Sequence, residues 1–302
     1  MTIWKEDEKT MLESVLQLIV SGIAMGFIYA LVGIEYTLVW NSTGLLNFSH
    51  DKFIMLSAYI FAGTFVIRMG LPPAIGVIAS LLVMFLFGVL VAVGIFNPLR
   101  SMASPIFAVM GTVVLGRILS EMVRLIWGPI PFTLPNYLTG TYQVGNIVIG
   151  RVNIWIIVIS SLLVAALQIF FKTTKTGKAM RCVQQNKKAA TLMGIDVSRN
   201  IVFTIVLSSL VCTVIGMLVI PLFTVDTAMA NMIGLKGFSS GVIGGFGYLP
   251  GVIAGGVFLG VLENFSTLVL PAVYKDCVGF VLMIIFLLVR PSGILGHRKN
   301  LR

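Results

Sequence analysis

Long apolar runs separated by short polar stretches recur through most of this sequence. The longest runs, each of about twenty residues, cover residues 15–40, 72–96, 103–123, 152–171, 201–225 and 272–289. An α-helix of about twenty apolar residues crosses the hydrocarbon core of a bilayer. Two shorter apolar runs lie at 54–67 and 250–262. The pattern predicts an all-α, polytopic transmembrane helical bundle of about eight or nine membrane segments, forming a single domain over residues 1–302.

Two polar or Gly-rich regions, 41–53 and 226–249, interrupt this pattern. They share the string G-L-x-x-F-S at 44–49 and 234–239, and each follows the first long span of its half. We therefore expect two broken membrane segments that approach one another, and an inverted repeat is possible. The alternative is a chance match in a chain rich in Gly, Leu and Phe.

Local signals refine the expected elements. Asn97-Pro98 is expected to end the span at 72–96, and the alternation around Gly145-Asn146 predicts a small hairpin within the loop 126–151. Pairs of glycines four residues apart allow close approach of helices. They are Gly22/Gly26, Gly251/Gly255 and Gly256/Gly260.

The composition excludes a soluble domain. Hydrophobic residues make up 58% and charged residues 11% of the chain, whereas about a quarter of a soluble domain is charged. The net charge of +10 does not indicate a nucleic-acid partner, because eleven basic residues lie in two places, 172–200 and 290–302. If both places are cytoplasmic, thirteen basic residues lie at inner positions and seven at outer ones. This bias predicts a multi-pass membrane protein with a cytoplasmic C-terminus and an external N-terminus.

Motifs of catalysis and ATP binding are absent from the sequence. It has no Walker A motif, no HExxH, no GxSxG and no metal-like spacing of its three cysteines. We expect no enzyme activity, no ATP hydrolysis by this chain, and no cofactor or metal.

Polar residues and glycines at the two interruptions are candidates for a solute path. They are Asn47, Ser49, His50, Ser239, Gly244 and Gly245. Such groups suit a path that releases its cargo, so we expect no high-affinity site there. The alternative is that His50 and Asp51 cap the following helix. Glu35 and Glu263 are expected to form interior pairs or to lie at helix ends.

The polar stretch 172–200 separates the two apolar halves. Within it, residues 187–193 predict a short amphipathic helix stopped by Gly194, with Ala189 and Ala190 leaving little side chain. By itself this is typical of a solvated basic helix next to a membrane. The run Lys188-Ala189-Ala190-Thr191-Leu192-Met193-Gly194 also resembles the EAA---G loop of ABC importer permeases, with Lys188 where Glu is usual.

A wider resemblance covers nearly the whole chain. The stretches GFIYALVGIEYTLVW, GLLNFSHDKFIMLSAY, TGKAMRCVQQNKKAATLMGIDV, GLKGFSSGVIGGFGYLPGVIAGGVFLGVLEN and RPSGILG are similar to the permeases of the branched-chain amino-acid (Liv-type) ABC importers. The resemblance implies a bacterial or archaeal cell-membrane protein surrounded by lipid. It implies as partners a second permease subunit, homologous or identical, two cytoplasmic ABC ATPase subunits and an extracytoplasmic solute-binding protein. It also implies ATPase coupling through Gly177, Arg181, Lys188, Ala189, Ala190 and Gly194.

Three departures from the family pattern bear on the cargo and on the partner. The family has Gly at the position of Glu35, Gly-Glu at Asp51-Lys52, and an acidic residue near Lys188. The first two leave open a branched-chain amino acid, urea, an amide or another small polar solute. The expected function is thus half of a translocation pathway for branched-chain or related amino acids, driven by separate ATPases. The alternative is an ion-coupled secondary transporter of a small polar solute, acting through Glu35 or Glu263.

Overall fold

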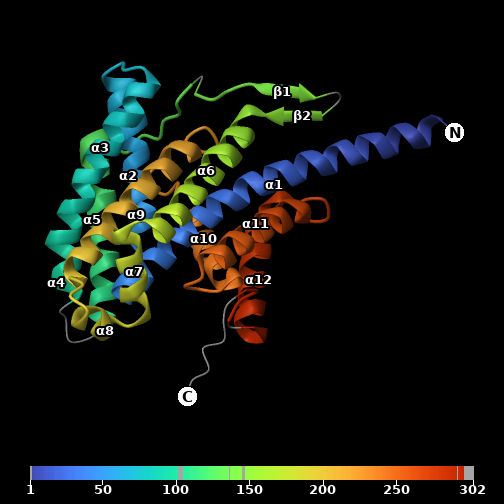
Figure 1. Cartoon of the computed structure of the whole chain (residues 1–302). Coiled ribbons are helices and arrows are strands. Elements are labelled where there is room, and N and C mark those ends of the chain that lie inside the picture. Colours follow the sequence, from blue (N-terminus) through green and yellow to red (C-terminus); the bar gives the residue numbers. More distant parts are fainter. Residues whose placement is uncertain (1, 101–104, 136, 145–146, 291, 296–302) are drawn as a thin grey trace. The chain divides into compact units, whose positions relative to one another are not determined.

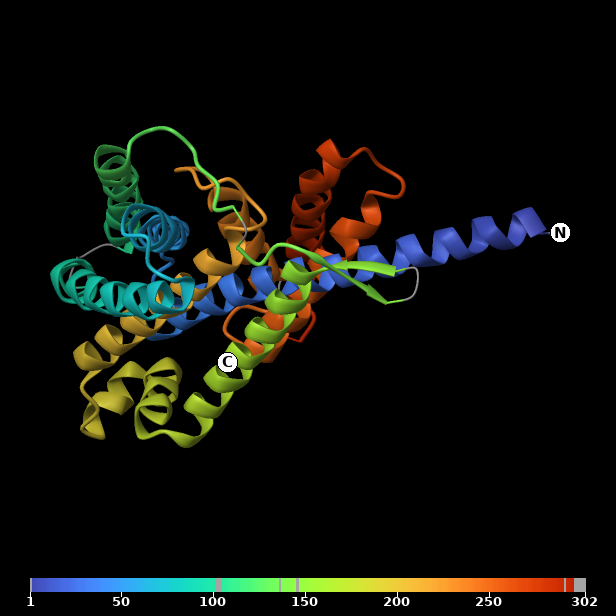
Figure 2. The same ribbon diagram turned by 90° about the horizontal axis from the view of Figure 1, so that it is seen from above.

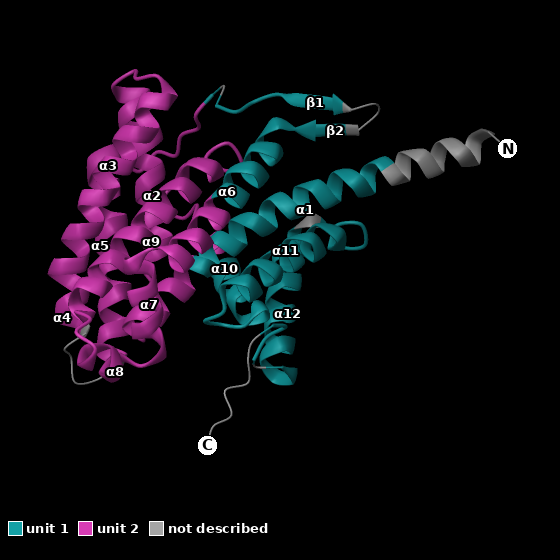
Figure 3. Ribbon diagram, in the orientation of Figure 1, with its two compact units in different colours: residues 1–34, 135–162, 235–302 teal, residues 35–134, 163–234 magenta. Residues whose placement is uncertain are grey.

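The computed structural model describes residues 2–100, 105–135, 137–144, 147–290 and 292–295. The described chain consists of helices joined by loops, together with one two-stranded hairpin (Figure 1). It forms two compact units, shown in Figure 3: unit 1 contains residues 1–34, 135–162 and 235–302, and unit 2 contains residues 35–134 and 163–234. Helices α1 (Thr2–Thr43), α6 (Arg151–Thr173) and α10 (Asn231–Gly244) contribute to both units.

Among the described residues, seven helices are long and apolar enough to cross a membrane. They are Glu13–Thr43, His50–Arg68, Pro73–Leu99, Ile106–Trp127, Arg151–Thr173, Val197–Val219 and Leu249–Ser266. The predicted helical, multi-span class is confirmed, but the seven spans are fewer than the eight or nine segments expected. The difference arises because α10 has 14 residues and α12 (Lys275–Val289) has 15, each short for a full crossing.

Unit 2 is built around helix α9 (Val197–Val219). At two contacts a glycine allows the backbone of α9 to lie close to that of a neighbouring helix. A Cβ on Gly216 of α9 would lie 2.7 Å from the Ile54 carbonyl oxygen of α2 (His50–Ala58). A Cβ on Gly88 of α3 (Pro73–Val91) would lie 3.1 Å from the Val206 Cα of α9. The small residues therefore place α9 in the core of the unit.

Two predicted boundaries in unit 2 are wrong. The second segment begins at His50 rather than near residue 54, and it continues from α2 into a π-helix at Tyr59–Arg68. Asn97-Pro98 does not end the next helix, which passes through a π-helical turn at Ala92–Phe96 into α4 (Asn97–Arg100). The wider turn provides room for the proline ring, which an α-helical turn would not.

The remaining helices of unit 2 complete its surface. They are α5 (Pro105–Trp127), α7 (Lys175–Gln185) and α8 (Lys187–Leu192). On α5, Glu121 forms an ion pair with Arg124 at 3.4 Å.

Unit 1 contains the predicted hairpin. Strands β1 (Thr141–Val144) and β2 (Ile147–Gly150) pair antiparallel, with Thr141 opposite Gly150. The predicted turn residues Gly145 and Asn146 lie outside the described residues. Figure 2 shows the hairpin leading directly into α6.

Helix packing in unit 1 uses all three predicted glycine pairs. Gly22 and Gly26 of α1 face α11 (Leu249–Ser266), since a Cβ on Gly26 would lie 2.6 Å from the Val257 Cα. In return, a Cβ on Gly260 of α11 would lie 2.5 Å from the Gly26 Cα. On its other side α11 meets α10, where a Cβ on Gly255 would lie 2.5 Å from the Ser240 carbonyl oxygen. The expected close approach of backbones is confirmed.

The two G-L-x-x-F-S strings adopt different conformations. Residues 44–49 form a non-helical connection between α1 and α2, whereas residues 234–239 lie within the continuous helix α10. The chain leaves α10 only at Gly245, with φ of +108°, and Gly247 follows with φ of +93°. The second copy of the string therefore does not mark an interruption, and the inverted repeat stays a prediction.

The end of α10 is capped by the C-terminal segment of the chain. The N–H groups of Ile294 and Leu295 donate to the carbonyl oxygens of Ile243 and Gly244, at 2.8 and 3.3 Å. These carbonyls would otherwise lack partners at the helix end. The described part of the predicted RPSGILG motif thus has a structural role; Pro291 and Gly296 lie outside the described residues.

Candidate functional site

The basic segment 172–200 folds into two short helices because polar residues cap them in succession. The side chain of Thr174 accepts from the Gly177 N–H at 3.0 Å and starts α7. Asn186 accepts from the Ala189 N–H at 3.1 Å and starts α8, and Asp196 accepts from the Ser198 and Arg199 N–H groups at the start of α9. Each cap satisfies helix donors that have no partner within the helix.

Gly177 and Arg181 fix α7 to the end of α6. A Cβ on Gly177 would lie 2.7 Å from the Phe171 Cα, so a side chain does not fit there. The Arg181 guanidinium donates to the Phe171 carbonyl oxygen through Nε at 3.0 Å and Nη2 at 2.5 Å. The structure thus gives both predicted residues an anchoring role.

The C-terminal end of helix α8 is exposed on the surface of unit 2. Ala190 is 3% exposed and packs inward, whereas Lys188 and Ala189 are exposed. Leu192 is 88% and Met193 81% exposed, and Gly194 ends the helix with φ of +79°. The predicted stop at Gly194 is confirmed, because this left-handed conformation favours glycine. The two exposed apolar residues were missed by the sequence interpretation, although they lie in the predicted loop.

Lys187 connects this segment to the end of α1 within unit 2. Its Nζ donates to the Thr43 carbonyl oxygen at 2.6 Å. The start of α8 is therefore attached to the end of α1 through a charge-assisted hydrogen bond.

The predicted path residues of unit 2 lie between α1 and α2 and are all buried. Asn47 Oδ1 accepts from the Ser49 N–H at 2.9 Å and from Ser49 Oγ at 2.7 Å. His50 Nδ1 lies 2.6 Å from the Asn47 carbonyl oxygen. His50 begins α2 and Asp51 lies in its first turn, as the capping alternative expects, but the N-cap residue is Ser49 and its side chain makes no capping hydrogen bond.

Glu35 joins this cluster from α1. It is fully buried; its Oε1 accepts a hydrogen bond from Ser208, and its Oε2 lies 3.6 Å from His50 Nδ1. The predicted interior position of Glu35 is confirmed, and its hydrogen-bond donor is Ser208. The sequence did not name His50 or Ser208 as its partners, since neither follows it at helical spacing.

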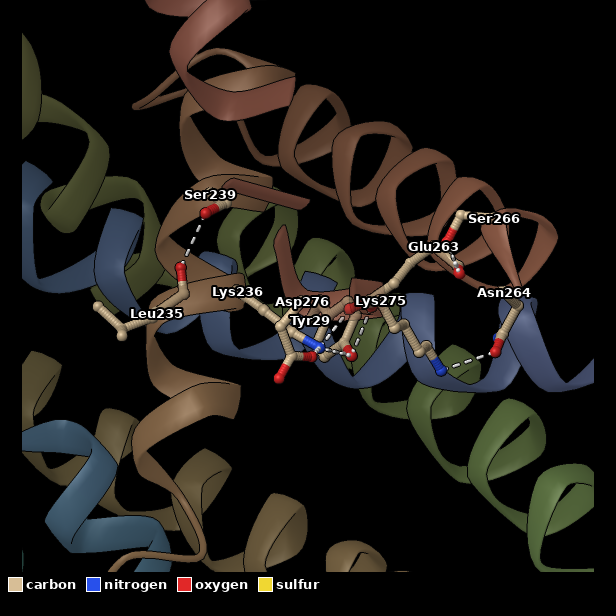
Figure 4. Close-up of polar contacts among 9 residues, drawn as sticks. All are labelled: Tyr29, Leu235, Lys236, Ser239, Glu263, Asn264, Ser266, Lys275 and Asp276. Atoms are coloured by element: carbon tan, nitrogen blue, oxygen red, sulfur yellow. Dashed lines mark hydrogen bonds and ion pairs between the residues drawn. The ribbon is translucent and has the colours of Figure 1, made fainter. Parts of the chain in front are cut away.

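Unit 1 contains a second buried polar cluster, drawn in Figure 4. Lys236 of α10 forms ion pairs with Glu263 of α11 and with Asp276 of α12, the latter at 2.6 Å. The Tyr29 hydroxyl of α1 donates to Glu263 Oε2 at 2.9 Å, and Lys236 Nζ donates to the same hydroxyl at 3.3 Å. Beside them, Lys275 Nζ donates to Asn264 Oδ1 at 2.7 Å. The predicted interior pair of Glu263 is confirmed, and four helices of unit 1 meet at it.

The other predicted path residues lie in unit 1 and have packing partners there. Ser239 is buried and donates to the Leu235 carbonyl oxygen at 3.0 Å (Figure 4). Its Oγ also lies 3.2 Å from Met283 Sδ. Gly244 meets α11, and a Cβ on Gly293 would lie 2.5 Å from the Gly245 Cα. The two groups of path residues belong to different units, so their predicted approach stays a prediction. The described residues hold no group of His, Cys, Asp and Glu side chains that could bind a metal.

Comparison with known proteins identifies similar permeases. Residues 18–287 match the family model described as "Branched-chain amino acid transport system / permease component". The chain is 31% identical to the high-affinity branched-chain amino acid transport system permease protein LivH of Salmonella typhimurium, over 93% of this chain and 96% of that one. It is 32% identical to the corresponding protein BraD of Pseudomonas aeruginosa, with the same coverage of both.

One solved structure is similar in fold. It is PsaBC from Streptococcus pneumoniae in complex with Fab, with a TM-score of 0.50, 14% identity and 97% of each chain covered. At this identity the likeness concerns the fold alone.

Proposed function

Because the chain belongs to the family of permease components of branched-chain amino acid transport systems, we propose that it forms half of the translocation pathway of an ABC importer. The cargo is a branched-chain or related amino acid, as in the names of the similar permeases. The assignment as a transport permease, and not as an enzyme, agrees with the absence of catalytic motifs from the sequence.

The energy comes from ATPase subunits separate from this chain. The sequence has no Walker A motif with which to bind ATP itself. Two cytoplasmic ATPases, a second permease subunit and an extracytoplasmic binding protein complete the transporter. The basic segment then faces the cytoplasm together with the C-terminus, and the N-terminus lies outside.

The observation that carries the ATPase proposal is the exposed end of α8. Leu192 and Met193 project from a helix whose base is held by the Asn186 cap and by Lys187. Apolar side chains on a rigid support are typical anchors of protein interfaces. We assign the docking surface to Lys188, Ala189, Leu192, Met193 and Gly194, with Gly177 and Arg181 as its support.

We assign to the solute path the residues beside the two predicted interruptions. Asn47, Ser49 and His50 line it in unit 2, and Ser239, Gly244 and Gly245 in unit 1. Gly245 is unsuited to a test by bulky substitution, because its φ of +108° strains any other residue irrespective of a path.

The docking proposal is tested by Leu192→Glu. A carboxylate at this position would place a charge in the apolar contact and cost about 2 kcal/mol or more. This corresponds to roughly thirtyfold weaker binding of the ATPase subunits. The measurement is the affinity of the purified permease pair for the ATPase subunits of the same transport operon, by titration calorimetry.

Met69→Glu provides the matched control. Met69 is also an exposed apolar residue of unit 2, at the end of the π-helix Tyr59–Arg68, and it lies outside the basic segment. It should leave ATPase affinity unchanged. Equal affinities for Leu192→Glu and the wild type would exclude α8 as the docking surface.

A further inference from the structure

His50 is the centre of a cluster in unit 2 whose polar groups are incompletely paired. Its ring is fully buried between Asn47, which precedes α2, and Glu35 of α1. Asp51 follows it in the first turn of α2. Each of these four residues has a buried side-chain atom that makes no hydrogen bond within the described part of the chain: Glu35 Oε2, Asn47 Nδ2, His50 Nε2 and Asp51 Oδ1.

The contacts already present determine what each unpaired atom can do. The Asn47 carbonyl oxygen only accepts, so His50 Nδ1 carries the proton of their 2.6 Å contact. His50 Nε2 then has a free lone pair in the neutral ring. Asn47 Oδ1 accepts from Ser49, which leaves its Nδ2 as an unused donor. Glu35 Oε2 and Asp51 Oδ1 accept when ionised. The cluster thus offers three acceptors and one amide donor.

A structural role alone explains this arrangement poorly. Each buried polar group without a partner costs about 1–3 kcal/mol, and four such groups lie together here. In lipid, no solvent reaches such groups from the side. A guest with N–H donors and a carbonyl or carboxylate oxygen would satisfy all four.

The charges of the cluster favour a cationic donor. Asp51 Oδ2 lies 3.2 Å from Lys52 Nζ, which also donates to Asn231. One ionised carboxylate is thereby matched by Lys52. Among the described residues, Glu35 contacts the His50 ring and the Ser208 hydroxyl, neither of which belongs to a lysine or arginine, so its ionised form leaves one negative charge in excess.

We propose that this cluster is a transient subsite for the charged ends of an amino acid during its passage. The α-ammonium group has three N–H donors for Glu35 Oε2, Asp51 Oδ1 and His50 Nε2, and the α-carboxylate accepts from Asn47 Nδ2. The inference rests on the proposed function and extends it, because it assigns recognition of the cargo to Glu35 and Asp51, two positions that depart from the family pattern.

Gly234 borders the Nε2 side of the ring and the Asp51 side chain. A Cβ at this position would lie 4.0 Å from His50 Nε2 and 3.0 Å from the Asp51 Cβ. The backbone of Gly234 is helical, so an alanine can adopt the same backbone conformation. Gly234→Ala therefore reduces the space at the subsite while preserving all of its polar groups.

The experiment is saturation-transfer NMR on the detergent-solubilised complex of permease and ATPases, without the binding protein. The probes are leucine, 4-methylpentanoate, which lacks the ammonium group, and isoamylamine, which lacks the carboxylate. The wild type should saturate the leucine methyl signals strongly and those of the two analogues weakly. Glu35→Gln and Gly234→Ala should each weaken the leucine signal at least fivefold.

Glu121→Gln is the matched control, because it makes the same change at an exposed carboxylate of unit 2 and should leave the leucine signal unchanged. Complex assembly is checked for every variant by gel filtration. If Glu35→Gln does not assemble, Gly234→Ala alone decides. Equal leucine signals in the wild type and the assembled variants would overturn the subsite. An equal signal from 4-methylpentanoate would also overturn it, because it would show that the ammonium group is not recognised.

Failure of the subsite is distinguishable from failure of the proposed function. ATP-driven import of leucine by the wild-type complex with its binding protein tests the proposed function by itself. If the complex imports leucine but Glu35→Gln does not change the leucine NMR signal, the proposed function stands and the subsite is excluded.

Discussion

At the scale of single residues, each unit contains one fully buried glutamate within a polar cluster. Both Glu35 and Glu263 are fully buried, and each has partners on other helices of its own unit. The sequence predicted interior pairs because an isolated charge within a membrane is costly. It did not predict the partners, since they lie on other helices far away in the sequence. Lys236, the partner of Glu263, lies in α10 with 6% exposure.

The ion pairs of Lys236 lead to a prediction on stability. Lys236→Met leaves Glu263 buried without its cation, and breaking one side of a buried pair costs about 3–5 kcal/mol. Asp276→Asn should cost less, because the Asp276 side chain is 43% exposed and its charge is screened by its surroundings. The measurement is the thermal unfolding of the purified permease in detergent.

The double variant Lys236→Met, Glu263→Gln is the control for this prediction. Removing both charges together leaves no uncompensated ion, so it should be more stable than Lys236→Met alone. Additive losses in the double variant would mean that the two side chains do not stabilise one another.

At the scale of helices, glycine positions determine which backbones touch. The sequence predicted close approach at the three glycine pairs, and the structure confirms it at α1, α10 and α11. Spacing alone does not name the partner of a glycine pair, so the pairing of Gly22 and Gly26 with Gly256 and Gly260 required the structure. Asn97-Pro98 failed as a boundary for a similar reason. A π-helical turn accommodates the proline, and no local signal marks such a turn.

The α1–α11 contact predicts a large effect of a single methyl group. In Gly260→Ala the added Cβ would lie 2.5 Å from the Gly26 Cα and from the Gly22 carbonyl oxygen, so the helices must separate. We expect a loss of about 1–3 kcal/mol, as for overpacking of a core. The midpoint of thermal unfolding should fall accordingly.

Gly279→Ala is the matched control in the same unit. Gly279 lies in α12, and its added Cβ would make an ordinary 3.5 Å contact with Leu259. Its unfolding midpoint should stay within a degree or two of the wild type. Equal midpoints for the two variants would show that α1 and α11 do not pack through their glycines.

At the scale of the whole molecule, the composition and the apolar runs were sufficient to predict a polytopic helical membrane protein. The basic segment was found because Lys and Arg concentrate there. Its exposed apolar end was not, because exposure of Leu192 and Met193 depends on which face of α8 packs inward at Ala190. The solute path was placed by two similar strings, and the second string is helical. Sequence identity between segments does not determine whether a helix continues through them.

The central claim is that separate ATPases drive transport through this chain, and reconstituted uptake tests it most directly. The permease pair, its ATPases and its binding protein are placed in liposomes, with the binding protein and labelled leucine on one face. The account predicts uptake that requires ATP on the opposite face and persists when valinomycin and nigericin remove the ion gradients. The account would be contradicted if uptake occurred without the ATPase subunits and was abolished by these ionophores. That result would instead identify an ion-coupled transporter.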